Sequence, residues 1–478
     1  MKTFRRVCGL AAALTLLAAC ESSSGEGTSS GPGGPGPTPG NGEQPGEPGG
    51  PDEPACVAPT SGPTIHQGDV EGDEVWTAAG SPHVVAYDVR VRNGAKLTIE
   101  PCADVQLAKK AHIQIAFPGT PNTGALVAEG TAKRPIKIHG QEGARWASLY
   151  VHAPGTARLA HVTFEGGGGG DFEDGATLHA LGDGVDGSDP IVFVDNVTIE
   201  GSFGTGAWIH RGASFIKGSK DLTIAGSGAG GASASPYPIE ISEHALDSLP
   251  NGRFTGNADD RILLDPEGGQ TAGSGILEDA TIHERGVPYL VGRSNGARLN
   301  VGGRPDGKLV TATIEPGVVM QFRAGGGLNV QHFTTEEPST AALRAIGTAA
   351  KPIVLTSAKA APAAGDWRGV WFGGALQPTN AIEHVRIEYA GGDCGCILLT
   401  CSNITEHEGA IIFTAPPPAA FVKNTTFFDI AGHAITEGYD GGFVDFRPTN
   451  VFESVAGCEQ TRPRENPTTC PAPRPACD

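Results

Sequence analysis

The chain carries one long pattern of short apolar segments twice. Residues 98–101, Thr-Ile-Glu-Pro, match residues 313–316, and further matches follow in the same order along both halves. The offset between matching residues increases along the chain, as it would if loops had accepted insertions after a duplication. The matched pairs include Asp73 and Asp279, Trp146 and Trp367, His161 and His384, Gly175 and Gly409, and Asn196 and Asn424.

The matches predict two tandem copies of one module. We expect the first copy to span residues 56–275 and the second to span residues 276–457. Residues 220–275 have no counterpart in the second copy.

The apolar residues inside each copy indicate strands. They form period-2 pairs such as Leu97 with Ile99, separated by Gly, Pro, Asn or Asp. The chain has 71 glycines, and no segment of the body sustains a helical period. Two all-β architectures fit such strands, an array of β-sandwiches and a solenoid of stacked rungs. Short strands, a small residue at almost every strand end and tolerated insertions favour the solenoid.

Several short sequence motifs resemble those of a known family. They include Leu-Thr-Ile-Glu-Pro at 97–101, Trp-Arg-Gly-Val at 367–370 and Glu-His-Val-Arg-Ile-Glu-Tyr at 383–389. Residues 70–457 thereby resemble the right-handed parallel β-helix lipoproteins with a pectin-lyase-like fold that occur on the surface of myxobacteria. The resemblance implies an all-β, right-handed parallel β-helix solenoid built from two tandem copies. Its motifs are structural, so it implies little about activity.

The N-terminus has the features of an export signal. Residues 1–19 combine a basic start with a short apolar run, and Leu17-Ala18-Ala19-Cys20 resembles a lipoprotein lipobox. We therefore expect cleavage before Cys20 and lipid attachment to its thiol, with an ordinary secreted protein as the alternative. Glu21, which is not Asp, favours delivery to the outer membrane, facing the periplasm or the cell surface. Residues 20–55 should form a disordered Gly/Pro/Ser tether, because they offer almost no apolar surface to bury.

The charge of the chain restricts its partners. The formal net charge is −19, which argues against nucleic acid and against electrostatic adhesion to anionic lipid. The expected partners are a lipid bilayer, through acylated Cys20, and polysaccharide or other cell-envelope components. We predict a monomer without a cofactor or a metal ion.

Eight cysteines remain once Cys8 leaves with the signal segment and Cys20 takes lipid. An even number in an exported chain indicates disulfides. Cys56 and Cys102 stand apart from the others and are expected to pair. No complete zinc-ligand pattern accompanies Cys394, Cys396 and Cys401, so a metal site there is the weaker alternative. The further disulfides are expected among Cys394, Cys396, Cys401, Cys458, Cys470 and Cys477, with residues 458–478 as a Cys/Pro-rich tail.

No catalytic motif stands out in the sequence. Acidic residues of the Gly-rich insertion resemble a solvated loop more than a calcium site, and Asp259-Asp260-Arg261 resembles a turn. His161 and His384 occupy matching places, which favours a structural role. Trp146 and Trp367 are expected to cover corners of the coil, with a sugar-stacking platform as the alternative. The acids considered in the insertion are Asp171, Glu173, Asp174, Asp183, Asp186 and Asp189.

Two functions remain open. The first is a membrane-anchored lipoprotein whose solenoid is a structural or binding module. The second is a lyase or glycoside hydrolase that acts on acidic polysaccharide. Acidic residues from at least three successive rungs that converge with an Arg or Lys would favour the enzyme, and scattered acids would favour the binding module.

Overall fold

The computed structural model places most of the body in detail. It divides the chain into two compact units, residues 1–48 and 49–478, and all described residues belong to the second. The signal segment, Cys20 and nearly all of the tether lie outside the described residues. The described residues are 53–117, 122–170, 175–183, 189–266, 275–302, 307–331, 340–392, 409–463 and 477, without the side chain of Asp189.

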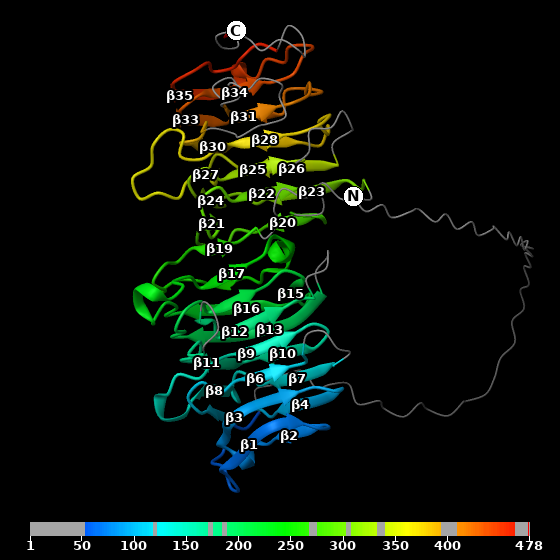
Figure 1. Ribbon diagram of the computed structural model, residues 1–478, viewed down its shortest axis with the longest axis vertical. Helices are drawn as coiled ribbons and strands as arrows, with labels where there is room; N and C mark the ends of the chain where they lie inside the picture. The colour runs from blue at the N-terminus through cyan, green and yellow to red at the C-terminus, as the bar shows by residue number, and fades with distance from the viewer. Residues whose placement is uncertain are drawn as a thin grey trace, which may run out of the picture. The chain divides into compact units, whose positions relative to one another are not determined.

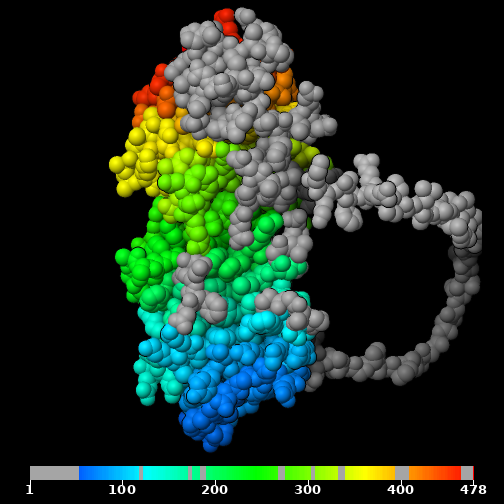
Figure 2. Space-filling model, viewed as in Figure 1, coloured from blue at the N-terminus to red at the C-terminus, as the bar shows by residue number. Residues whose placement is uncertain are grey.

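The described part of the second unit is a parallel β-solenoid, as the sequence predicts. Each of its named strands pairs in parallel with a strand about one coil earlier or later in the chain. Consecutive rungs therefore follow sequence order, from β1 (Thr64–Val70) to β35 (Val451–Val455) in Figure 1. On the surface, the colours of successive segments likewise follow one another in Figure 2.

The strands between residues 64 and 264, called the first segment from here on, form three stacks. The first stack contains β2 (Glu74–Trp76), β4 (Ala95–Ile99), β7 (Gly124–Glu129), β10 (Thr156–Ala160) and part of β13 (Asp189–Glu200). The second contains parts of β1, β3 (His83–Val91) and β13, with β5 (Asp104–Leu107), β8 (Ile136–Gly140), β11 (Val162–Glu165), β16 (Lys220–Ala225) and β18 (Gly252–Arg253). The third contains the other parts of β1 and β3, with β6 (Ile113–Ile115), β9 (Leu149–His152), β12 (Leu178–Leu181), β14 (Ala207–Ile209), β17 (Ile239–Ile241) and β19 (Ile262–Leu264). A short strand, β15 (Ala213–Phe215), pairs with the beginning of β13.

The strands between residues 280 and 455, called the second segment, also form three stacks. One contains β20 (Ala280–Ile282), β23 (Val310–Ile314), β26 (Ala341–Ile346), β29 (Ala381–Glu383) and β32 (Val422–Lys423). Another contains β22 (Arg298–Val301), β25 (Gly327–Val330), β28 (Val370–Phe372), β31 (Gly409–Phe413) and β34 (His433–Glu437). The last contains β21 (Tyr289–Val291), β24 (Val319–Phe322), β27 (Ile353–Ser357), β30 (Val385–Glu388), β33 (Thr426–Ile430) and β35.

Helical structure in the described part is limited to short 3-10 turns. They are η1 (Ala78–Gly80), η2 (Gln141–Gly143), η4 (Gly231–Ser233), η5 (Glu243–Ser248) and η7 (Arg447–Thr449). Within these residues, no helix has the length and apolar character needed to cross a bilayer.

Alternate side chains of each strand fill the interior. In the first stack, Leu97, Leu126 and Ala157 occupy one column in register, and all three are buried. Because neighbouring rungs are about 4.8 Å apart, each side chain packs directly on the next one in its column. This explains why strands of three to six residues are long enough to bury a continuous core.

Parallel strand pairing continues across residue 276. However, a stack of the first segment is not always continued by the strands of matching sequence in the second segment. The sequence of β5 matches that of β24, yet β24 does not continue the stack of β5. Instead, β19 of the third stack pairs with β21, and β21 pairs with β24. The second stack has its last described pairing at β18. The third stack of the first segment is therefore continued at the junction by strands whose sequence matches the second stack.

A disulfide joins Cys56 to Cys102, with a Cα–Cα distance of 5.5 Å. This is the pair that the sequence predicts. Cys102 has a φ of +75°, and its counterpart Gly317 has a φ of +94°. The same left-handed turn therefore follows β4 and β23, and glycine adopts it without the strain that a side chain brings.

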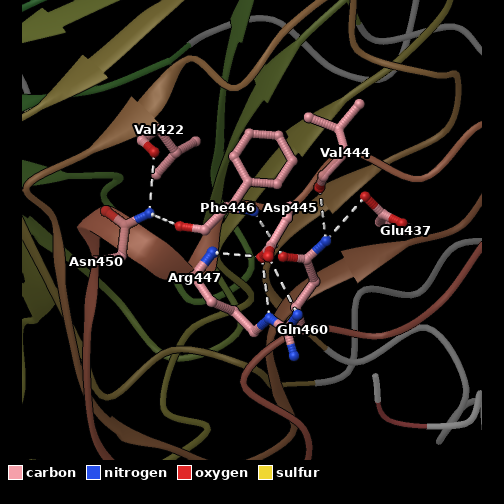
Figure 3. A network of polar contacts seen from close by, with 8 residues as sticks. All are labelled: Val422, Glu437, Val444, Asp445, Phe446, Arg447, Asn450 and Gln460. Carbon is pink, nitrogen blue, oxygen red and sulfur yellow. Dashed lines mark hydrogen bonds and ion pairs between the residues drawn. The ribbon is translucent and has the colours of Figure 1, made fainter.

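The C-terminal end of the interior is closed by buried polar groups (Figure 3). Glu437 pairs in register with Phe413, so its side chain lies at the end of an apolar column. Gln460 Nε2 donates hydrogen bonds to Glu437 Oε1 at 3.1 Å and to the Val444 carbonyl at 2.8 Å. Gln460 Oε1 accepts from the Phe446 amide at 2.9 Å. Gln460 itself forms a parallel bridge to Ile435 of β34, so this buried polar layer lies among the last described rungs of the solenoid.

Candidate functional site

One outer column of the third stack carries rings in place of ordinary surface residues. In β9, Leu149 and Val151 belong to the core, so Tyr150 and His152 point to the outer side of the sheet. Tyr150 is in register with His179 on β12, and His179 is in register with Trp208 on β14. We call the side chains of Gln114, Tyr150, His152, His179, Trp208 and His210 the histidine–aromatic face.

The rings of this face stack on one another from one rung to the next, and also within a rung. The centroids of Tyr150 and His179 are 4.8 Å apart, which equals the usual spacing of neighbouring strands. The centroids of Trp208 and His210 are 3.8 Å apart, and those of His179 and His210 are 5.5 Å apart. Stacked rings cover one another's ring planes, and Tyr150 Oη and His179 Nε2 are themselves buried, so Trp208 and His210 are the most accessible rings of this column.

Hydrogen bonds between side chains hold these rings in register. His179 Nδ1 and His210 Nε2 are 3.1 Å apart, and one proton lies between them. Gln114 Nε2 and His152 Nε2 are also 3.1 Å apart. His179 is only 3% exposed, and its Nε2 has no hydrogen-bond partner among the described residues.

The three histidines are uncharged near neutral pH. Burial, with a smaller contribution from nearby His112, lowers the pKa of His152 to about 4. Burial is the main cause that lowers the pKa of both His179 and His210 to about 3, and neighbouring His and Arg side chains contribute less. Each imidazole therefore offers one donor and one acceptor at pH 7.

Arg293 borders the face and is neutralised by two acids. Its guanidinium lies 4.6 Å from the ring centroid of Trp208. It forms ion pairs with Glu240, which is fully buried, and with Asp265, at 3.3 Å from Nε to Oδ2. Glu240 lies on β17, Asp265 follows β19 and Arg293 follows β21, so these three charges come from successive rungs.

Acidic residues from three rungs do not converge here. The described residues bring two carboxylates together, and both pair with the same arginine. Asp259 pairs with Arg261 and accepts from its amide, while Asp260 accepts from the Asn257 amide, so both acids order a turn. Asp183 is exposed. Asp171, Glu173, Asp174, Asp186 and the side chain of Asp189 lie outside the described residues. No group of three His, Cys, Asp or Glu that could hold a metal ion occurs in the part of the chain that is described.

The matched tryptophans are structural. Trp146 and Trp367 are both completely buried, so the sugar-platform alternative is wrong for both. Trp146 Nε1 donates to the Glu165 carbonyl at 2.8 Å, and Trp367 Nε1 donates to the Glu388 carbonyl at 2.7 Å. The two indoles therefore make the same contact in both segments.

The matched histidines also share one backbone role. His161 and His384 have φ values of +47° and +51°. The carbonyl of His161 accepts from the Ile136 amide, and that of His384 accepts from the Ile353 amide. Both histidines thus form the same turn before a strand, and they lie apart from the histidine–aromatic face.

Of the other cysteines expected to form disulfides, Cys458 and Cys477 lie among the described residues. Cys458 and Cys477 form a disulfide with a Cα–Cα distance of 5.3 Å. Cys20, Cys394, Cys396, Cys401 and Cys470 lie outside the described residues.

Sequence reasoning missed the histidine–aromatic face, although a signal for it exists. Tyr150-Val151-His152 and Trp208-Ile209-His210 share the order aromatic, aliphatic, His. With period-2 alternation this order buries the aliphatic residue and places both rings on the outer side.

No known family model, curated protein or solved structure matches this chain. The class of protein therefore follows from the fold alone, which is a parallel β-solenoid.

Proposed function

We propose that this protein is an exported, lipid-anchored lipoprotein whose β-solenoid binds uncharged glycan along the histidine–aromatic face. The lipobox at Cys20 and the likeness of the body to pectin-lyase-like β-helix lipoproteins support the anchor. The observation that carries the binding role is the run of neutral ring edges on successive rungs, from Tyr150 to His210.

Neutral polar edges match the chemistry of sugar hydroxyls. A hydroxyl donates one hydrogen bond and accepts others, and a neutral imidazole does both. Gln114 on β6 and Trp208 on β14, with His210 just after it, are the half-buried members of the face, and β9 and β12 lie between them. A ligand that contacts both ends of the face must extend over several rungs, as a chain of sugars does.

The charges near the face favour an uncharged ligand. The three histidines carry no charge at pH 7, and Arg293 is already paired with Glu240 and Asp265. With a chain charge of −19, a uronic polymer would meet repulsion without a free cation on this face to offset it.

The test is a binding measurement on the chain from residue 21 onward. Isothermal titration with neutral glucan and chitin oligosaccharides should show binding, and oligogalacturonate should bind more weakly. Trp208→Ala should weaken neutral glycan binding by roughly ten- to a hundredfold, the loss of a central contact. The matched control is Trp371→Ala, which removes a half-buried tryptophan from the outer side of β28 in the other segment.

Two results would contradict the proposal. One is equal loss of binding in the Trp208 and Trp371 variants, which would place the ligand elsewhere. The other is turnover of uronic polymers to unsaturated products, which would make the protein a polysaccharide lyase.

A further inference from the structure

Titratable rings close the N-terminal end of the solenoid interior. His66 on β1 is in register with Val85, and His83 on β3 is in register with Val105. Val85 and Val105 are completely buried core residues, so both imidazoles lie on the inner side, at the end of apolar columns. His83 is 2% exposed, and the side chain of His66 is 12% exposed.

The two imidazoles form a chain of polar contacts between two acceptors. His83 Nε2 lies 2.8 Å from the Thr77 carbonyl, and His83 Nδ1 lies 2.9 Å from His66 Nε2. His66 Nδ1 lies 3.1 Å from Glu74 Oε1. Trp76 donates to the same Glu74 oxygen at 2.7 Å, and its ring stacks on His66 at 4.2 Å.

Counting protons shows how much charge this chain can hold. The Thr77 carbonyl and the Glu74 carboxylate only accept, so the three contacts need three protons, whereas two neutral imidazoles supply two. One added proton completes every contact and makes His66 and Glu74 an ion pair. A further proton places N–H groups on both nitrogens of the His66–His83 contact, which at 2.9 Å must then break.

The surroundings oppose a second charge. The groups that act on the pair are the carboxylates of Glu74 on β2, Glu100 after β4 and Asp104 on β5, and each of them favours protonation. Burial nevertheless dominates and lowers the pKa of both His66 and His83, and His83 contributes to lowering the pKa of His66. A pKa lowered by folding means that stability is present above the unfolded value and is lost as pH falls.

We propose that the His66–His83 contact is an acid-sensitive latch that holds β1 across the end of the interior. At neutral pH the latch is closed. When acidification protonates both imidazoles, the contact breaks and β1 detaches from β3, which uncovers Val85 and the end of the core. The latch is independent of glycan binding, because none of its side chains belongs to the histidine–aromatic face.

Hydrogen exchange on the full-length protein tests the latch. Amide protection, corrected for the intrinsic exchange rate, is measured for β1 and for β7 as an internal reference between pH 7.5 and pH 4.5. Below about pH 6.5, the ordinary imidazole value, β1 should lose protection by about tenfold per pH unit for each imidazole that titrates. Protection of β7 should stay constant.

Variants separate the latch from a general effect of acid. Glutamine at position 83 can donate to Thr77 and accept from His66 without titrating, so His83→Gln should keep β1 protected at low pH. His112→Gln is the control, because His112 is also half-buried with a lowered pKa but contacts Asp88 on another part of β3. In this control variant, β1 should lose amide protection at low pH as it does in the unaltered protein.

Constant protection of β1 down to pH 4.5 in the unaltered protein would overturn the latch. If His83→Gln is already unprotected at pH 7.5, the titration of His66 and His83 is followed directly by exchange of their ring C–H groups. Both rings should titrate below the ordinary imidazole value, and ordinary values for both would reject the proposal.

Discussion

His179 and His210 share a proton between ring nitrogens that lie 3.1 Å apart, on strands β12 and β14 of one stack. Neither imidazole can take a second proton on that side without breaking the contact. The pair therefore fixes the orientation of both rings, and burial keeps them uncharged.

This relationship predicts the titration of the face. Because burial lowers the pKa of His179 and His210 to about 3, neither ring should change its charge between pH 5 and pH 8. Histidine-specific hydrogen exchange, read by mass spectrometry, should show no midpoint for either ring in this interval. Glycan binding should also be constant between pH 5 and pH 8. A midpoint near 6.5 for His179 would contradict the buried, neutral description.

The matched tryptophans should have matched energetic effects. Each is fully buried and donates one hydrogen bond to a backbone carbonyl, so Trp146→Ala and Trp367→Ala should each lower the free energy of unfolding by about 3–5 kcal/mol. Urea unfolding, compared at the transition midpoints, measures the loss. A small effect for one variant and a large effect for the other would show that the two sites are not equivalent.

The disulfide between Cys56 and Cys102 should stabilise the first rungs. Replacing both cysteines by serine should lower the stability of the body by about 2–4 kcal/mol, the usual range for such a bond. Peptide mapping without reduction checks the pairing itself.

Position 102 also offers a comparison that isolates its backbone. With Cys56 replaced by serine, Cys102→Gly should be more stable than Cys102→Ser by up to about 1 kcal/mol, because the φ of +75° suits glycine. Equal stability of the two variants would mean that the turn relaxes once the disulfide is gone.

The anchor is tested separately from the fold. Cys20→Ala should leave the protein soluble and unprocessed by the lipoprotein peptidase, because only a thiol forms the thioether to lipid. Fractionation of cells into membranes and soluble protein, with detection of the body, measures this. Continued association of the variant with membranes would disprove the lipid anchor.

The stacking of short parallel strands could be predicted from the sequence. Pairs such as Leu97 and Ile99, with breaks at Gly and Pro, leave few other arrangements for the chain, and both residues are buried in the core. The equivalent turns at His161 and His384 were also visible as matching sequence. Local patterns of this kind survive because each rung contacts mainly its neighbours.

The candidate site could not be predicted in the same way. Tyr150, His179 and Trp208 come from three different coils, and only the register of the strands brings them into one column. Register depends on loop lengths, which vary between the two segments. The closing groups His66 and His83 were hidden for a related reason, since a buried histidine at the end of a column has the same spacing as an aliphatic residue within it.

The pairing at the junction makes the outer column that carries the rings differ in chemistry between its two ends. Along one outer column, the rings up to Trp208 are followed by Glu240, Leu263, Leu290 and Gln321. The second segment does not repeat these rings, because Trp371, whose sequence position matches Tyr150, is followed in register by Ile412 and Thr436. The ring column instead continues with an acid and two buried leucines, so its two ends differ in chemistry, and an extended ligand of the proposed kind would have one favoured direction along it.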